Sequence, residues 1–160
     1  MRLALLAHEK FPGRAKTAVG ILRYGTDEVI AVLDRDNAGD RVRDHVPDVQ
    51  DAPIVSGMAE GEASIDALVV GIAPIGGGFD ESWRADVRTA MERGADVIAG
   101  LHYFLEDDEE FAALAAEHDV DIWDVRKPPE DLTVAEGVAD TVDAEVITTV
   151  GTDCSTGKMT

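Results

Sequence analysis

Short apolar runs alternate with amphipathic stretches along most of the chain. Runs rich in Val, Ile, Leu and Ala are typical of buried strands, and apolar residues spaced three or four apart are typical of helices. The pattern predicts strands over residues 2–7, 28–34, 67–73, 96–99, 120–125 and 145–150. It predicts helices over residues 15–24, 81–93, 107–118 and 134–140.

This alternation of strands and helices predicts a Rossmann-like α/β fold, a parallel sheet with helices on both faces. The run over 67–73 (ALVVGIA) is apolar throughout, as expected for a strand that is covered on both faces. Two consecutive prolines after Arg126 and Lys127 interrupt the pattern. We therefore expect a Rossmann-like domain over 1–125, a linker with a short helix over 126–144, and the first strand and loop of a truncated second domain over 145–160.

The charge is unusual for a globular chain. The 160 residues contain 33 Asp and Glu against 14 Lys and Arg, a formal net charge of −19. Two explanations are open: a partner with a basic surface, or a halophilic chain in which high salt screens self-repulsion. The acids are dispersed along the chain, which favours the second explanation. Either way, the charge disfavours nucleic-acid and anionic-membrane partners.

The cysteine count, the length of the apolar runs and the N-terminus bear on the cellular compartment. One cysteine, Cys154, excludes an internal disulfide, and no apolar run approaches the roughly 18 residues of a membrane span. The apolar N-terminus leads directly into charged residues without a cleavage site, so we interpret it as a strand and expect a cytoplasmic protein. The four His are scattered, which predicts no metal site. A small-molecule ligand is expected, and the sequence leaves open whether the chain forms a homo-oligomer.

The last ten residues contain the strongest motif. A P-loop needs small residues that wrap a phosphate, a Lys for the outer phosphates and a hydroxyl for Mg²⁺. A predicted strand leads into such a segment, and we expect phosphate contacts from Gly151, Thr152, Asp153, Cys154, Ser155, Thr156, Gly157, Lys158, Met159 and Thr160. Met159 occupies the usual hydroxyl position, and the hydroxyl follows at Thr160. The alternative is a Gly-, Ser- and Thr-rich turn that happens to contain Lys.

The spacing Gly-Thr-Asp-x-x-x-Gly-Lys resembles the P-loop of the dethiobiotin synthetase group. The resemblance implies ATP-type phosphate binding with Lys158 on the phosphates. Phosphate binding also relies on the helix that follows such a loop. We therefore expect the isolated chain to be a fragment without a complete nucleotide site.

The loops after the predicted strands carry the candidate residues of the first domain, because ligands bind at the carboxyl ends of parallel strands. His8 and His102 follow two strands and are either acid/base groups or hydrogen-bonded loop residues. Asp34 ends another strand, where such folds place a ribose-binding acid. The G-x-G-x-x-G fingerprint is missing, however, so an ordinary loop acid is the alternative.

Glycines and scarce cations complete the set of candidates. Gly76, Gly77 and Gly78 follow the strand over 67–73 and form either a backbone nest for an anion or a flexible turn. The cations near the same edge point to an anionic ligand or to a salt-bridged loop; they are Lys10, Arg14, Lys16, Arg126 and Lys127.

Three segments together resemble the family catalogued as domain of unknown function 1611: GIAPIGGGFDESWR, GADVIAGLHYFLEDDEEFAALAAEHDVDIWDVRKPP and VGTDCSTGKMT. The resemblance covers essentially the whole chain. It implies an N-terminal Rossmann-like domain joined to a C-terminal P-loop domain. Some members are D-amino-acid N-acetyltransferases that act on D-glutamate with acetyl-CoA, which implies a P-loop used for CoA phosphates or ATP.

Three functions follow as hypotheses. The first is the N-terminal part of a D-glutamate-type N-acetyltransferase that uses acetyl-CoA, inactive as an isolated chain. The second is an ATP-dependent, Mg²⁺-using P-loop enzyme of the dethiobiotin synthetase type. The third is a non-catalytic fragment that only folds or docks on a complete homologue.

Overall fold

The computed structural model describes residues 1–60, 64–129, 131, 141–145 and 147. The chain divides into two compact units, Met1–Lys127 and Pro128–Thr160, and the named helices and strands all lie in the first. The predicted helix over 134–140 and the P-loop over 151–160 lie outside the described residues, as does most of the predicted strand over 145–150.

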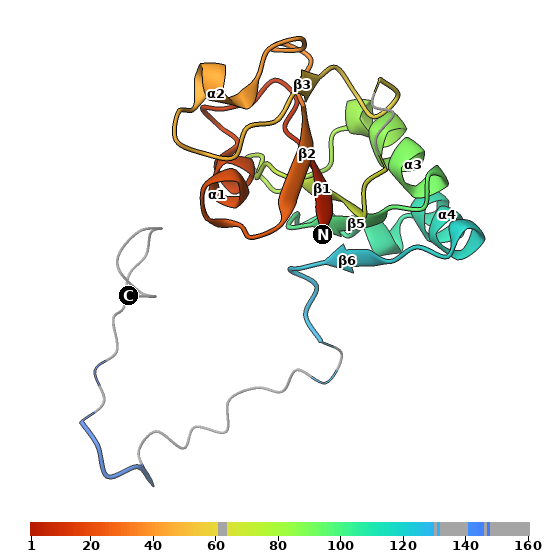
Figure 1. Ribbon diagram of the computed structural model, residues 1–160. Helices are drawn as coiled ribbons and strands as arrows, with labels where there is room; N and C mark the ends of the chain where they lie inside the picture. The colour runs from red at the N-terminus through yellow and green to blue at the C-terminus, as the bar shows by residue number, and fades with distance from the viewer. Residues whose placement is uncertain (61–63, 130, 132–140, 146, 148–160) are drawn as a thin grey trace. The chain divides into compact units, whose positions relative to one another are not determined.

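A six-stranded sheet forms the centre of the first unit (Figure 1). Its strands are β1 (Arg2–Leu6), β2 (Glu28–Leu33), β3 (Ile54–Val55), β4 (Ala67–Val70), β5 (Asp96–Ala99) and β6 (Ile122–Asp124). They lie in the order β3-β2-β1-β4-β5-β6, and each neighbouring pair is parallel. The predicted Rossmann-like class is therefore confirmed.

Helices cover both faces of this sheet (Figure 1). The helix α1 (Lys16–Tyr24) lies on one face, and α3 (Arg84–Glu92) and α4 (Glu109–His118) lie on the other. β2 and β3 lie on one side of β1, whereas β4, β5 and β6 lie on the other. Right-handed crossovers that run in opposite directions along the sheet place their helices on opposite faces. Shorter turns of helix complete the unit: α2 (Val42–His45) and the 3₁₀ turns η1 (Glu81–Trp83) and η2 (Leu105–Asp107).

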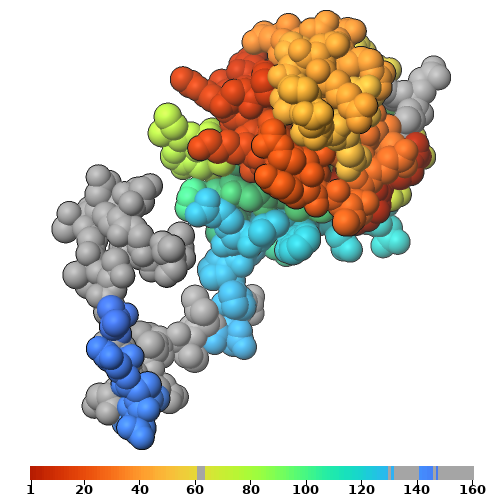
Figure 2. Space-filling model, turned by 60° about the vertical axis from the view of Figure 1, so that its left-hand side comes forward, coloured from red at the N-terminus to blue at the C-terminus, as the bar shows by residue number. Residues whose placement is uncertain are grey.

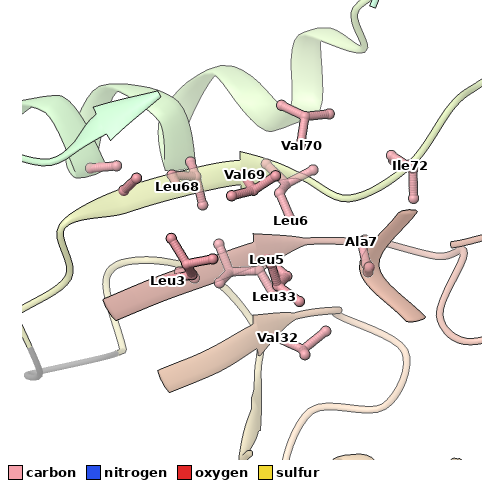
Figure 3. Close-up of a cluster of buried hydrophobic side chains, with 14 of the residues drawn as sticks. Leu3, Leu5, Leu6, Ala7, Val32, Leu33, Leu68, Val69, Val70 and Ile72 are labelled. Atoms are coloured by element: carbon pink, nitrogen blue, oxygen red, sulfur yellow. The ribbon is translucent and has the colours of Figure 1, made fainter. Parts of the chain in front are cut away.

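The core consists of aliphatic side chains from the central strands (Figure 3). Leu5, Leu6 and Leu68 are fully buried, and every residue of β4 is buried, as its unbroken apolar sequence predicts. Figure 3 shows that Ile72, just beyond β4, belongs to the same cluster. The core therefore continues to the carboxyl edge of the sheet, where it supports the loops.

Two elements escaped the sequence pattern. β3 has only two residues and α2 only four, too few for either periodicity to be visible. Several predicted strands also end earlier than expected. β4, for example, ends at Val70, because Gly71 to Ala73 turn into the loop that borders the candidate site.

Candidate functional site

Successive strands of the sheet are added in one direction from β1 to β3 and in the opposite direction from β4 to β6, so the strand order reverses between β1 and β4. β1 pairs with β2 on one side and with β4 on the other, so the loops that follow β1 and β4 diverge from adjacent strands. Such a switch point opens a crevice, and ligands of doubly wound folds bind there. The two loops carry several of the predicted contacts, from Lys10 to Lys16 and from Gly76 to Gly78.

The helix α1 packs closely against the residue that follows β4. The Ala18 backbone N–H donates to the Gly71 carbonyl oxygen at 2.8 Å. A Cβ at Gly71 would lie 2.7 Å from the Ala18 Cβ, a distance that side chains do not tolerate. Glycine at this position therefore allows the helix to start directly beside the end of β4.

Two overlapping lobes make up the crevice, with volumes of about 250 and 270 Å³. Arg14, Ala73 and Ile75 line both lobes. Lys10, Ile72 and Pro74 line only the first, whereas Gly13, Lys16 and Thr17 line only the second. Figure 2 shows the two contributing segments projecting side by side, the one after β1 in red and the one after β4 in yellow-green.

The crevice is cationic in a strongly anionic chain. The structure brings together Lys10, Arg14 and Lys16, three of the predicted anion contacts. Among the described lining residues there is no Asp or Glu. Apart from Thr17 and Gly13, the other lining residues are apolar, and Ile75 among them is fully exposed.

Asp34 holds the loop that carries these cations. Its carboxylate is fully buried and accepts from the Glu9 backbone N–H at 2.6 Å and from the Asn37 side-chain amide at 2.5 Å. The Asn37 amide also donates to the Phe11 carbonyl oxygen at 3.1 Å. Both carboxylate oxygens are thus engaged by the chain itself. This geometry favours the alternative of a structural loop acid over a ribose contact.

His8 is buried rather than open to the crevice. Only 1% of the residue is exposed, and its Nε2 lies 2.9 Å from Oδ2 of Asp86, in the first turn of α3. Its Nδ1 is buried without a hydrogen-bond partner among the described residues. Since a carboxylate oxygen only accepts, the Nε2 that faces it is the donor of this hydrogen bond. We therefore regard His8 as a positioning residue that ties β1 to α3.

Asp86 receives further donors. The Met58 backbone N–H donates to its Oδ1 at 2.7 Å, and an Arg35 guanidinium nitrogen lies 3.5 Å from its Oδ2. Burial raises the pKa of the Asp86 carboxyl, but the hydrogen bonds from His8 and Met58 outweigh burial and hold that pKa below its ordinary value. A Cβ at Gly57 would lie 2.6 Å from Oδ1, so glycine there leaves room for the carboxylate.

The glycine loop after β4 packs on His102. Gly76 and Gly77 have φ values of +85° and +67°, and a Cβ at Gly77 would lie 2.1 Å from Cδ2 of His102. The Gly77 N–H donates to the Pro74 carbonyl oxygen, and the Gly77 carbonyl oxygen accepts from the His102 N–H at 2.8 Å. His102 itself is exposed. These contacts give the loop a defined shape, and they favour a structured turn over a free anion nest.

An aromatic cluster anchors the far end of the glycine loop. Phe79 stacks on Tyr103, with 5.5 Å between ring centroids, and the Tyr103 hydroxyl donates to Asp108 at 2.6 Å. Arg84 also donates to Asp108, at 2.9 Å, and lies over the Phe111 ring. Burial raises the pKa of the Asp108 carboxyl, yet donation by Arg84 and Tyr103 lowers it to about 2. The same carboxylate caps α4 by accepting from its first backbone N–H groups.

The remaining predicted residues lie elsewhere. Arg126 is exposed beyond β6, at the edge of the sheet, and lines neither lobe. Lys127 donates to Glu106 and Asp107, so for this residue the salt-bridged alternative holds. Residues 151–160, the predicted phosphate contacts, lie outside the described residues. In the part of the chain that the structure describes, no group of His, Cys, Asp and Glu is placed to hold a metal, and no helix is long and apolar enough to span a membrane.

Sequence reasoning missed the partners of His8. Asp86 lies among the inward-facing residues of α3, beside Trp83, Val87 and Ala90. An acid on the apolar face of an amphipathic helix is itself a signal, because a buried carboxylate needs partners. The apolar walls of the crevice were also missed, since only the backbone path shows that Ile72 and Ile75 face the cations.

Comparison with known proteins places the chain. The model of a Rossmann-like domain, domain of unknown function DUF1611_N, matches residues 35–128. A D-glutamate N-acetyltransferase of Tritonibacter scottomollicae is 30% identical over 145 residues, which are 91% of this chain and 40% of that protein. A D-glutamate N-acetyltransferase of Pseudoalteromonas is 34% identical over 92 residues, 58% of this chain and 27% of that protein. The chain thus spans well under half of these relatives.

Solved structures agree. The crystal structure of a DUF1611 family protein from Anabaena variabilis is 37% identical, with a TM-score of 0.76, over 88% of this chain and 41% of that one. An amine dehydrogenase from Mycobacterium smegmatis, 16% identical over 75% of this chain and 38% of its own, has a TM-score of 0.55 and shares only the fold. The chain therefore belongs to the DUF1611 family, and most of its described part is the N-terminal Rossmann-like domain of that family.

Proposed function

We propose that this chain forms the N-terminal, Rossmann-like part of an N-acetyltransferase that acts on D-glutamate or a similar D-amino acid with acetyl-CoA. The observation that carries the proposal is the crevice at the switch point, lined by Lys10, Arg14 and Lys16 without an acid. The names of the two curated relatives support the same activity. In this arrangement the first domain binds the carboxylates of the amino acid.

The chemistry sets the tasks of the protein. The substrate amine must lose a proton before its nitrogen can form the new amide bond, and the proton must pass to a base. Acetyl-CoA supplies the acetyl group as an activated thioester: as the new C–N bond forms, the acyl C–S bond breaks, and CoA leaves as a thiolate that takes up a proton. The CoA phosphates are assigned to Gly151–Lys158, which lie outside the described residues, so the fit of these residues to CoA is left to experiment.

Of the two candidate histidines, His8 and His102, the second is the candidate base. It is exposed at the carboxyl edge of the sheet and held by the glycine loop, whereas the His8 ring is buried against Asp86. A group that accepts a proton from substrate must reach it directly or through one water. An exposed imidazole meets that condition, and a buried one supports the loop instead.

The test compares the chain with a version that continues through the C-terminal region found in the relatives. Both are incubated with acetyl-CoA and D-glutamate, and N-acetylated product is measured by mass spectrometry. The proposal predicts product from the longer protein. Formation of ADP from Mg·ATP by the longer protein, without N-acetylation, would replace this proposal with the ATP-dependent alternative.

A further inference from the structure

The distribution of cations over the two lobes of the crevice is asymmetric. Lys10 lines only the first lobe and Lys16 only the second, while Arg14 lines both. Ala73 and Ile75 also line both lobes, so the lining that the lobes share combines one cation with two apolar side chains. The crevice thus offers one further cation in each lobe and an apolar surface common to both.

The cations of the crevice differ from most other described Lys and Arg residues in lacking hydrogen bonds and ion pairs. Most described Lys and Arg side chains donate hydrogen bonds or form ion pairs, as Arg35, Arg84 and Lys127 do. Among the described residues, the exceptions are Lys10, Arg14, Lys16, Arg23 and Arg126. Three of these exceptions line one crevice, although the chain carries a net charge of −19. None of the three side chains forms a hydrogen bond or an ion pair within the described residues, which leaves their donor groups available to a ligand. The charge of Lys10, with that of Arg35, adds to the hydrogen bonds from Ser82 in lowering the pKa of the Asp80 carboxyl.

The apolar lining limits which anion fits. Ile75 is fully exposed and Ala73 is exposed, while the buried Ile72 beside them belongs to the core. Removing such surface from water favours a ligand with methylene groups between its charges. Inorganic phosphate or acetate could bind the cations of one lobe but would leave the apolar side chains exposed to water. A ligand with two anionic ends and a short aliphatic middle would use both lobes and the apolar side chains.

We propose that the crevice is a site for short-chain α,ω-dicarboxylates. In this site Arg14 determines which spacing of the two carboxylates is bound. Arg14 suits this role because its planar guanidinium can donate to two acceptors at once. Lys10 secures one carboxylate and Lys16 the other, while the methylene groups lie on Ala73 and Ile75. This inference rests on the proposed function and deepens it, because it explains how an acidic amino acid would be distinguished from a neutral one.

The test measures affinity for simple probes with the 160-residue chain itself. Isothermal titration calorimetry at low salt compares glutarate, with two carboxylates, against acetate and inorganic phosphate. We expect glutarate to bind at least about tenfold more tightly than acetate or phosphate, a ratio that corresponds to about 1.4 kcal/mol. Equal affinities for the three probes would overturn the proposal and leave a general anion site.

Variants assign the effect to Arg14. Arg14→Gln should lose about tenfold in glutarate affinity and change acetate affinity much less, whereas Arg14→Lys should fall between the two because it keeps the charge without the planar fork. The matched control is Arg23→Gln, which removes the same charge from the exposed last turn of α1, away from the crevice. Equal losses in Arg14→Gln and Arg23→Gln would show a non-specific charge effect and overturn the proposal.

The proposal and the proposed function fail separately. If the longer protein acetylates D-glutamate while glutarate does not bind the crevice, the dicarboxylate site is wrong and the activity stands. If glutarate binds as expected and no D-amino acid is acetylated, the site stands and the activity is wrong. Arg14 is exposed, so its variants are expected to fold, and thermal melting checks this directly.

Discussion

Removing the Asp86 side chain should destabilise the domain severely. In the folded chain this carboxylate accepts from the His8 ring at 2.9 Å and from the Met58 N–H at 2.7 Å, and it lies 3.5 Å from an Arg35 nitrogen. Asp86→Ala would leave the His8 ring, whose Nδ1 already has no described partner, without any hydrogen bond in the core. Breaking a buried pair on one side costs about 3–5 kcal/mol. Because the Asp86 side chain is 10% exposed, we expect a loss near the lower end, about 3 kcal/mol.

The pH dependence of this loss is fixed by the sign of the pKa shift. The Asp86 carboxyl has a lowered pKa in the folded chain, so its stabilisation is present at neutral pH and is lost as the pH falls through that pKa. The difference between wild type and Asp86→Ala should therefore shrink once the pH falls below about 4, the range of an unperturbed Asp. Asp86→Asn, which keeps an acceptor for Met58, should lose less than Asp86→Ala.

Urea unfolding followed by circular dichroism measures both effects. The free energies of unfolding of the three proteins are compared at pH 7 and again at decreasing pH. A free energy of unfolding of Asp86→Ala within about 0.5 kcal/mol of wild type at pH 7 is what an ordinary surface substitution would give. In that case the buried His8–Asp86 contact does not stabilise the domain. The reasoning would then be wrong.

The remaining predictions concern the glycine loop and its anchor. Gly77→Ala should lower the free energy of unfolding by about 1–3 kcal/mol, because a Cβ at φ +67° meets His102. Gly76→Ala, which has positive φ but no atom near its Cβ, should lose less by the same assay, and equal losses would refute the contact. The Tyr103 hydroxyl donates a hydrogen bond to the Asp108 carboxylate, and this bond raises the pKa of Tyr103. Absorbance titration should show the Tyr103 pKa moving toward its ordinary value in Asp108→Asn. Since the Asp108 pKa is about 2, its contribution to stability should disappear as the pH falls from about 4 to 2, and Asp108→Asn should flatten that part of the stability profile.

Much of the fold was visible in the sequence. The strand over 96–99 was predicted with its observed bounds, and the run predicted to be covered on both faces contains β4, in which every residue is buried. Short, nearly unbroken apolar runs made these predictions possible, because a strand that is covered on both faces carries no polar side. β3 could not be predicted, because a strand of two residues exists only through its pairing with β2.

The candidate site was only partly predictable. The cations Lys10, Arg14 and Lys16 stood out because cations are scarce in this chain, and the structure places all three on one crevice. His8 and Asp34 share the same edge but point into the domain, where they hold loops together. A sequence shows which residues follow a strand. Tertiary packing decides which of them face a ligand.

The most direct test of the account is an NMR titration of the isotopically labelled 160-residue chain with D-glutamate. The central claim is that the switch-point crevice is the ligand site of this domain. It predicts saturable chemical-shift changes at Lys10, Arg14 and Ile75, with little change in the separate groove between α4 and β6 that Ala112, Ala115 and Ile122 help to line. Changes confined to that groove, or no saturable change at the crevice at millimolar D-glutamate, would contradict the claim.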